Sequence, residues 1–160
     1  MFDLRVVKRK LFKSLARMAP GCDLRLWLLR RSGYTIGKDV YLAEDVMICA
    51  ELDDFGEKLV IGDRASIAPR VTFVLDSHPN ASRLTEVMPG THGRIVIGPD
   101  AWLGVGVCVM PNVTIGEGAV IGAGSVVTHD VPSWVVAAGV PARVLRAVPQ
   151  RRETVDQVQP

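Results

Sequence analysis

The sequence predicts an all-β solenoid in which a short strand and a corner recur every six residues. Small or apolar residues stand four positions after each repeat anchor, and Gly directly follows six of the anchors. A period of six matches neither the helical period of about 3.6 residues nor the alternation of one long strand. It matches very short strands joined by corners, where the anchor points inward and Gly, Asn or Asp takes the unusual backbone angles. The anchors are the branched or bulky apolar residues Ile36, Leu42, Ile48, Ile61, Ile67, Phe73, Ile97, Leu103, Val109, Ile115, Ile121 and Val127.

The composition agrees with one folded domain of this kind. The chain has 160 residues, of which 48% are apolar and 22% charged, so it is long enough for one core and is not a disordered polymer. Aromatic residues are scarce at 6%, whereas 15 Gly and 10 Pro favour tight corners. The twelve repeats predict four triangular coils. Stacked coils of this number span about 20 Å, and each buries the apolar face of its neighbour.

Two interruptions divide the repeat. Residues 53–58 shift it by one position, so the spacing from Ile36 to Ile61 is one more than a multiple of six. Residues 79–94 form a longer loop rich in Pro, Ser, Thr and Gly, and loops on a rigid scaffold are common places for binding chemistry. We therefore expect a basic helical cap over residues 1–33, a repeat domain over 34–146 and a C-terminal tail over 147–160.

The segment 1–33 is basic and predicts two helices. It carries a net charge of +7, whereas the remainder carries −5. Pro20-Gly21 ends the first helix, Asp23 caps the second and Gly33 closes it. Two interpretations stay open: the helices cover the open end of the solenoid, or their basic amphipathic face contacts anionic lipid or a lipid-linked acceptor. The apolar stripe of the first helix consists of Leu4, Val7, Leu11, Leu15 and Met18.

Several classes of protein are excluded by what the sequence lacks. There is no apolar stretch of the roughly 20 residues that a membrane-spanning helix needs, and no apolar core of a secretion signal. Cys22, Cys49 and Cys108 show no metal-binding or redox spacing, which predicts reduced thiols and a cytoplasmic location. No nucleic-acid partner is expected, because no aromatic RNA-binding motif, zinc-finger spacing or basic stripe follows the N-terminal segment.

Five runs of the sequence point to a known family. They are Arg70 to Pro79 (RVTFVLDSHP), Ile95 to Gly98 (IVIG), Ala101 to Gly104 (AWLG), Val120 to Thr128 (VIGAGSVVT) and Ala137 to Arg146 (AAGVPARVLR). These runs resemble the hexapeptide-repeat acetyltransferases, in particular the galactoside, maltose and nodulation-factor type of sugar O-acetyltransferase and the polysaccharide O-acetyltransferases. The resemblance covers roughly residues 34–148 and implies a left-handed parallel β-helix. It also implies a homotrimer that binds acetyl-CoA in clefts between subunits and a carbohydrate acceptor, without a metal.

The chemistry of such a transfer requires a base. A sugar hydroxyl is a poor nucleophile until its proton is shared, and a histidine side chain can exchange protons near neutral pH. The resemblance assigns this role to His78, which follows Asp76 and Ser77 and opens the long loop. Asp76 is a further candidate for binding the acceptor and for orienting His78. It is placed on the same side of the strand as His78, and whether the two touch stays open. Cys49 and Cys108 fall near inward repeat positions and are interpreted as core residues.

The resemblance also assigns binding residues. Trp102 would lie beside the pantetheine and the acceptor, Gly104, Ala123 and Thr128 would line the pantetheine, and Arg143 and Arg146 would meet the nucleotide phosphates. Ordinary packing of Trp102 and salt bridging by the two arginines stay open as alternatives. Galactoside- and maltose-type relatives carry an acceptor-binding Asn about one coil before the histidine. This chain has no Asn in residues 48–54 and offers Glu51, Asp53 and Asp54 there, so we expect an acceptor other than a simple galactoside or maltose.

Three other functions remain as alternatives. An N-acetyltransferase of amino sugars is the nearest, since an amine needs less help from a base. A γ-carbonic-anhydrase-like solenoid would need three converging histidines, and the spacings of 14 and 37 between His78, His92 and His129 do not suggest that. A non-catalytic scaffold is the third. His92 is expected to face solvent, and His129 at a corner is a candidate contact for a phosphate of CoA.

Overall fold

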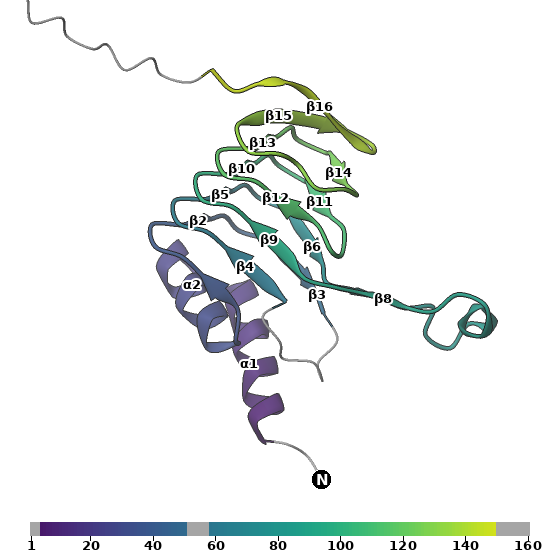
Figure 1. The fold of residues 1–160 in the computed structure, drawn as a ribbon. Coiled ribbons are helices and arrows are strands. Elements are labelled where there is room, and N and C mark those ends of the chain that lie inside the picture. Colours follow the sequence, from purple (N-terminus) through teal and green to yellow (C-terminus); the bar gives the residue numbers. More distant parts are fainter. Residues whose placement is uncertain (1–3, 51–57, 150–160) are drawn as a thin grey trace, which may run out of the picture.

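Two helices precede the strands and lie at one end of the molecule (Figure 1). The computed structural model describes residues 4–50 and 58–149, with α1 at Leu4–Met18 and α2 at Cys22–Arg31. Gly33, with φ of 97°, follows α2 as expected. The expectation that Asp23 caps α2 is wrong: the N-cap is Gly21, no side chain caps the helix, and Asp23 lies inside the first turn. Its carboxylate there complements the positive end of the helix dipole instead.

Three parallel sheets form the body, and the chain visits them in a fixed rotation. The first sheet joins β1 (Thr35–Ile36), β4 (Leu59–Ile61), β9 (Ile95–Ile97) and β12 (Thr114–Ile115). The second joins β2 (Tyr41–Leu42), β5 (Ser66–Ile67), β10 (Trp102–Leu103), β13 (Val120–Ile121), β15 (Val135–Gly139) and β16 (Ala142–Ala147). The third joins β3 (Met47–Cys49), β6 (Thr72–Val74), β11 (Cys108–Val109) and β14 (Val126–Val127). One passage through all three is called a coil below. Among the described strands of these sheets, only β16, which turns back on β15, runs antiparallel.

Strand register places the repeat anchors above one another. Ile36 pairs with Ile61 and Ile61 with Ile97, which confirms the one-position shift inferred at residues 53–58. Eleven of the twelve anchors are buried, and Ile48 is half-buried. The second repeat positions are mostly buried too, but Ser77 is exposed because the chain leaves the coil there. Leu52, another such position, lies outside the described residues.

The corners use two kinds of residue. Asp39, Asp45, Asp100 and Asn112 have left-handed backbone angles, as expected for corner Asp and Asn, and so do Arg64, Arg70 and Trp134, which the sequence did not single out. The Gly that follows an anchor has a different reason to be there. A Cβ on Gly98 would lie 2.6 Å from the backbone nitrogen of Glu117 in the next coil. Stacking of the coils therefore requires Gly at this position.

An arm leaves the body between the third and the first sheet (Figure 1). It begins with β7 (Asp76–Ser77), passes through the short helix η1 (Arg83–Glu86) and returns through β8 (Thr91–His92). β7 and β8 pair antiparallel, with Asp76 opposite His92 and Ser77 opposite Thr91. The long loop expected at residues 79–94 therefore starts and ends in a two-stranded ribbon, which fixes the residues at its base.

The helices cover the first coil only in part. Leu26, Leu28 and Leu29 of α2 are buried. The predicted apolar stripe of α1, in contrast, remains exposed in the single chain at Val7, Leu11, Leu15 and Met18, with Met18 83% exposed. Side chains of Leu4 to Val6 lie outside the description. Neither described helix combines the length and apolar character needed to cross a bilayer.

Candidate active site

The base of the arm gathers the chemically active side chains. His78 follows β7, and the return of the arm through β8 brings His92 beside it, with 5.5 Å between the ring centroids. Nitrogen or carboxylate oxygen atoms of Asp76, His78 and His92 all lie within 4.8 Å of one another. His92 is exposed, as expected, but its proximity to His78 was not predicted. An antiparallel ribbon closes the distance between these two histidines, which their spacing of 14 in the sequence did not indicate. His129 is not among the three residues of this cluster, so the expectation against three converging histidines stays a prediction.

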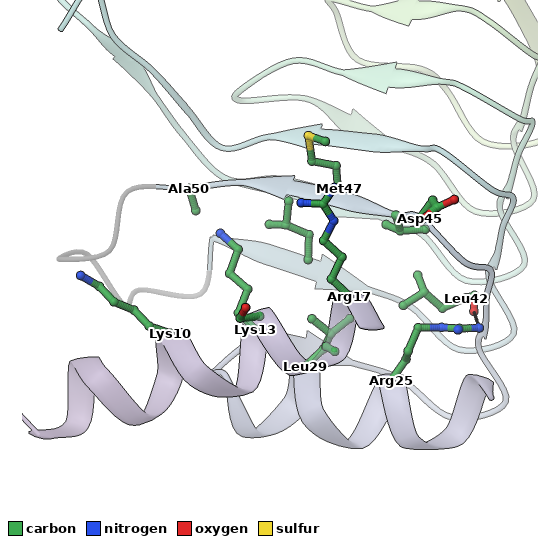
Figure 2. Close-up of a pocket in the computed structure, with 13 residues that line it drawn as sticks. Lys10, Lys13, Arg17, Arg25, Leu29, Leu42, Asp45, Met47 and Ala50 are labelled. Carbon is green, nitrogen blue, oxygen red and sulfur yellow. Dashed lines mark hydrogen bonds between the residues drawn. The ribbon is translucent and has the colours of Figure 1, made fainter. Parts of the chain in front are cut away.

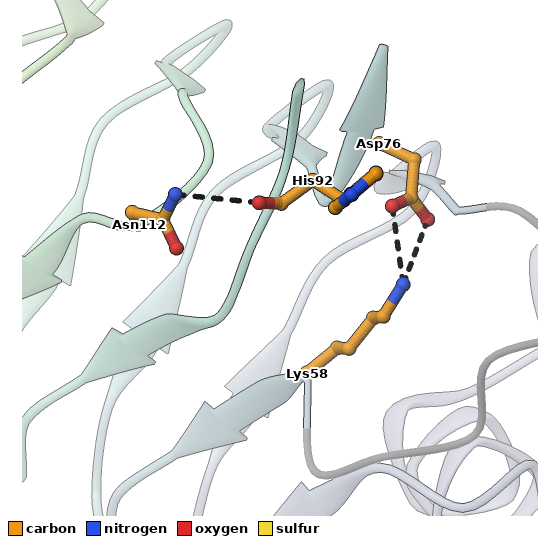
Figure 3. Close-up of polar contacts among 4 residues, drawn as sticks. All are labelled: Lys58, Asp76, His92 and Asn112. Atoms are coloured by element: carbon orange, nitrogen blue, oxygen red, sulfur yellow. Dashed lines mark hydrogen bonds and ion pairs between the residues drawn. The ribbon is translucent and has the colours of Figure 1, made fainter. Parts of the chain in front are cut away.

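Asp76 is held by a lysine from the start of the coil that leads into the arm. Lys58 Nζ lies 3.1 and 3.3 Å from the two carboxylate oxygens of Asp76 (Figure 3). The side chain of Asp76 is only 3% exposed and that of Lys58 13%, so this is a buried ion pair. The carboxylate also influences two residues from the N-terminal part of the chain. Burial, reinforced by the charge of Asp76, raises the pKa of Tyr34 to about 12. Burial lowers the pKa of Lys13, opposed by Cys49 and Asp76.

Close backbone approach explains two glycines of the arm. A Cβ on Gly90 would lie 1.8 Å from His78 Nδ1, so the imidazole rests directly on the backbone of the arm. A Cβ on Gly93 would lie 1.9 Å from Asn112 Oδ1. Asn112, from the corner of the next coil, donates from Nδ2 to the carbonyl oxygen of His92 at 3.3 Å (Figure 3). The two glycines thus let the ribbon lie against the scaffold and against the ring of His78.

The other predicted site residues divide between two edges of the body. Thr128 lies after β14, on the edge between the third and first sheets from which the arm leaves. Its Oγ1 is 2.8 Å from His129 Nδ1, and both residues are exposed. Gly104 and Ala123 lie after β10 and β13, on the edge between the second and third sheets, and Trp102 on β10 is 56% exposed. A single chain therefore does not bring Trp102, Gly104 and Ala123 to the edge that carries His78.

The two predicted arginines lie on the last strand. Arg143 and Arg146 are exposed on β16, and each donates to a neighbouring carbonyl, that of Ala142 at 2.9 Å and that of Ala147 at 3.3 Å. Neither has a salt bridge to an acidic residue in the described ranges 4–50 and 58–149. Asp53 and Asp54, predicted to contact the acceptor, lie outside the described residues, as does Glu51.

The cysteines and the Asp–His cluster limit the chemistry available. Cys49 and Cys108 are half-buried, close to the core positions expected, and burial raises the pKa of the Cys108 thiol, which makes it a poor nucleophile. Asp76, His78 and His92 have the donor atoms of a metal site. The ammonium group of Lys58 already supplies a positive charge at Asp76, however, and a cation there would have to compete with it. An imidazole at the base of a fixed ribbon is suited to proton transfer.

The fold and the site together define a class: a repeat protein of three parallel sheets that carries two histidines where an arm leaves the coils. Comparison with known sequences and structures gives the family. The sequence model of the bacterial transferase hexapeptide (six repeats) matches residues 94–129. Galactoside O-acetyltransferase of Escherichia coli K12 is 42% identical over 120 residues, which cover 75% of this chain and 57% of that protein. The chain thus spans less than two thirds of the length of this curated relative.

Solved structures give a longer match. A galactoside acetyltransferase in complex with coenzyme A superposes with a TM-score of 0.69 and 30% identity, over 91% of this chain and 81% of that one. A hexapeptide-repeat-containing acetyltransferase of Vibrio cholerae, complexed with acetyl coenzyme A, superposes with a TM-score of 0.73 and 25% identity, over 91% and 88% of the two chains. The chain belongs to the hexapeptide-repeat acetyltransferase family.

Proposed function

We propose that this protein transfers the acetyl group of acetyl-CoA to a hydroxyl group of a carbohydrate, with His78 as the general base. The observation that carries the proposal is the position of His78, at the base of the arm, against Gly90 and beside His92. The relatives named as galactoside acetyltransferases and the neighbours solved with CoA or acetyl-CoA support the reaction. We also infer that the coils of this chain wind left-handed, as in the family of those neighbours.

The transfer balances without a covalent intermediate on the protein. The imidazole of His78 accepts the proton of the acceptor hydroxyl while its oxygen forms a bond to the thioester carbonyl carbon. The carbon–sulfur bond then breaks, and the imidazolium returns the proton to the departing thiolate of CoA. Backbone N–H groups at a coil corner would stabilise the negative charge that builds on the carbonyl oxygen. Asp76 and Lys58 act on His78 by positioning the ribbon rather than by touching substrate.

We infer that the site is completed by a second copy in a homotrimer. His78 lies on one edge of the body, whereas Trp102, Gly104 and Ala123 lie on another. A threefold arrangement that faces one edge toward the other would unite them, with the pantetheine between the copies. The apolar side chains at the tip of the arm, Val87 and Met88, are 73% and 59% exposed in the single chain, which suits burial against a partner.

The remaining assignments follow from the same arrangement. Arg143 and Arg146 are exposed and free of acidic partners within the described residues, so their guanidinium groups suit the phosphates of CoA. Thr128 lies on the same edge as the arm and would line the pantetheine together with Gly104 and Ala123 of the neighbouring copy. The acceptor would meet Trp102, Asp53 and Asp54. Residues 1–33 would form a separate cap on the acetyltransferase domain.

The first test is a transfer assay. Acetyl-CoA is incubated with sugars and with small amines, and the released thiol is measured with a dye. We expect sugars to react and amines not, and His78→Ala to lower the rate at least about 100-fold while the trimer persists. Faster transfer to amines, with substantial activity left in His78→Ala, would replace this proposal by N-acetyl transfer. Stoichiometric zinc at Asp76, His78 and His92 would point to a metal enzyme instead.

A second test addresses the shared site. His78→Ala and Trp102→Ala chains are each nearly inactive if both residues act. In trimers refolded from equal amounts of the two, chance pairs an intact His78 edge with an intact Trp102 edge at about one quarter of the interfaces. Recovery of about a quarter of the native rate supports a site between subunits. Mixtures no more active than their parents would show that each chain holds its own complete site.

A further inference from the structure

A cavity between the N-terminal helices and the first coil lies beside the proposed active site. Its volume is about 300 Å³, and its walls come from α1, α2 and β3 with the corner before it (Figure 2). Leu29 and Leu42 give it an apolar floor. Lys13 and Arg17 rise from α1 toward β3, and Arg25 points from α2 toward Leu42 (Figure 2). A space of this size is at the lower end of pockets that hold small molecules and accommodates about one sugar ring.

The cavity is strongly basic. Four of its side chains, Lys10, Lys13, Arg17 and Arg25, are cationic and only Asp45 is acidic. Within the described ranges, no carboxylate forms a salt bridge with any of these four. Lys13 is half-buried, so its charge is partly removed from water without a neutralising partner in contact among the residues that the structure describes. Such a group is stabilised by an anion that enters the cavity.

Arg25 provides the second observation. It is 8% exposed, and its guanidinium donates from Nη1 to the carbonyl of Ala19 at 3.0 Å and from Nη2 to that of Leu42 at 3.1 Å. Its Nε is buried and has no acceptor among the described residues. A buried donor without an acceptor is costly, and a ligand oxygen in the cavity would supply one. Arg25 is thus a fixed donor in the wall of the cavity.

The cavity is electrostatically connected to the proposed catalytic residues. Lys13 lies near enough to Cys49 and Asp76 for both to influence its titration, and Asp76 pairs with His92 at the base of the arm. The geometry agrees: β3, which lines the cavity, pairs with β6, and the N–H of Leu75, next to Asp76, donates to the carbonyl of Cys49 at 2.7 Å. The cavity therefore lies against the strand next to the one that leads into Asp76 and His78. The N-terminal end of the chain is also the part with a net charge of +7.

We propose that the cavity formed by Lys10, Lys13, Arg17 and Arg25 binds the oxyanion of an acidic carbohydrate acceptor, either a carboxylate or a phosphate on the sugar. The inference rests on the proposed function, because it assigns a substrate class to that site. Ammonium and guanidinium groups bind both oxyanions through charge-assisted hydrogen bonds. A neutral sugar of the same size would offer the four cations no counterion.

The experiment compares matched ligands and matched variants. Binding of methyl β-glucuronide, glucose 6-phosphate and methyl β-glucoside is measured by calorimetry, and transfer to the 4-nitrophenyl glycosides is measured in parallel. Lys10→Gln/Arg17→Gln removes two exposed cations from the cavity and leaves the buried Arg25 in place. Lys8→Gln/Lys38→Gln removes two exposed lysines that do not line the cavity, so the net charge of the two variants is equal.

We expect the native chain to bind at least one acidic ligand more tightly than the glucoside. The cavity variant should weaken that binding about tenfold, which corresponds to two partly solvated charge contacts, and the control should change it less than about twofold. The ligand whose binding responds, the glucuronide or the sugar phosphate, identifies the oxyanion. Equal binding of acidic and neutral ligands, or equal losses in both variants, overturns the proposal even when transfer occurs. If binding is as expected but no glycoside is acetylated, the oxyanion subsite is supported and the proposed function is overturned.

Discussion

Gly90→Ala tests whether the position of His78 controls the reaction. The new methyl carbon would lie 1.8 Å from His78 Nδ1. Non-bonded carbon and nitrogen atoms keep about 3.5 Å apart, so the ring or the ribbon must move by about 1.7 Å. Displacements of about 1 Å in a catalytic group can cost about 100-fold in rate. We therefore expect kcat/KM to fall about 100-fold, which is about 2.7 kcal/mol of transition-state stabilisation.

The same substitution should leave the fold intact. The φ angle of Gly90 lies outside the left-handed region, and the arm lies away from the core, so the free energy of unfolding should change by less than about 1 kcal/mol. Transfer of acetyl from acetyl-CoA is measured beside urea unfolding, with Arg83→Ala, an exposed change on the same arm, as the control. A Gly90→Ala protein that keeps half the native rate while remaining folded would refute the reasoning that ring position limits catalysis.

Three further predictions concern the stability of the fold and the titration of its groups. Lys58→Met leaves the buried carboxylate of Asp76 without its ion pair, so urea unfolding should show a loss of about 3 kcal/mol, and a loss below about 1 would contradict a buried pair. Phe73→Ala empties the largest fully buried side chain of the core and should cost about 4 kcal/mol in the same experiment, whereas a loss below about 2 would mean that the coils collapse around the gap. The tyrosinate absorbance that Tyr34→Phe removes should titrate with a midpoint at about pH 12. Because folding raises this pKa, the free energy of unfolding should fall as the pH rises above the ordinary tyrosine pKa of about 10. A midpoint near 10 would contradict the burial of this hydroxyl.

The repeat was predictable because one physical requirement acts at every coil. Each inward position must fill the same narrow interior, so Ile67, Leu103 and Ile121 occupy equivalent places in the second sheet, and spacing alone identifies them. The prediction fails where this requirement ends. Ser77 fits the spacing but is exposed, because the ribbon of the arm has replaced the coil. Arg64 and Arg70 take left-handed corner angles that residue type did not indicate.

The site was less predictable, since its contacts depend on how the arm folds back. The resemblance singled out His78, but nothing in the spacing places His92 beside it or Lys58 on Asp76. One signal was available: Gly90 and Gly93 flank Thr91 and His92, and glycines near a histidine can indicate close backbone approach. The exposure of the apolar stripe on α1 could not be predicted either, because periodicity identifies the apolar face of a helix but not what covers it.

The geometry gives a reason why this scaffold would work as an assembly. Stacked coils hold each corner rigidly, so a residue on one edge cannot swing to another, and His78 and Trp102 stay apart within the chain. Rigidity is an advantage once a second copy supplies the missing wall, because reacting groups fixed on two stiff bodies lose little further entropy on meeting. The arm is the part that would meet the second copy. It carries His78 at its base, where Lys58 from the start of the same coil binds Asp76 and Asn112 from the next coil binds the backbone of His92. In the proposed trimer, its exposed tip would make the contact between copies.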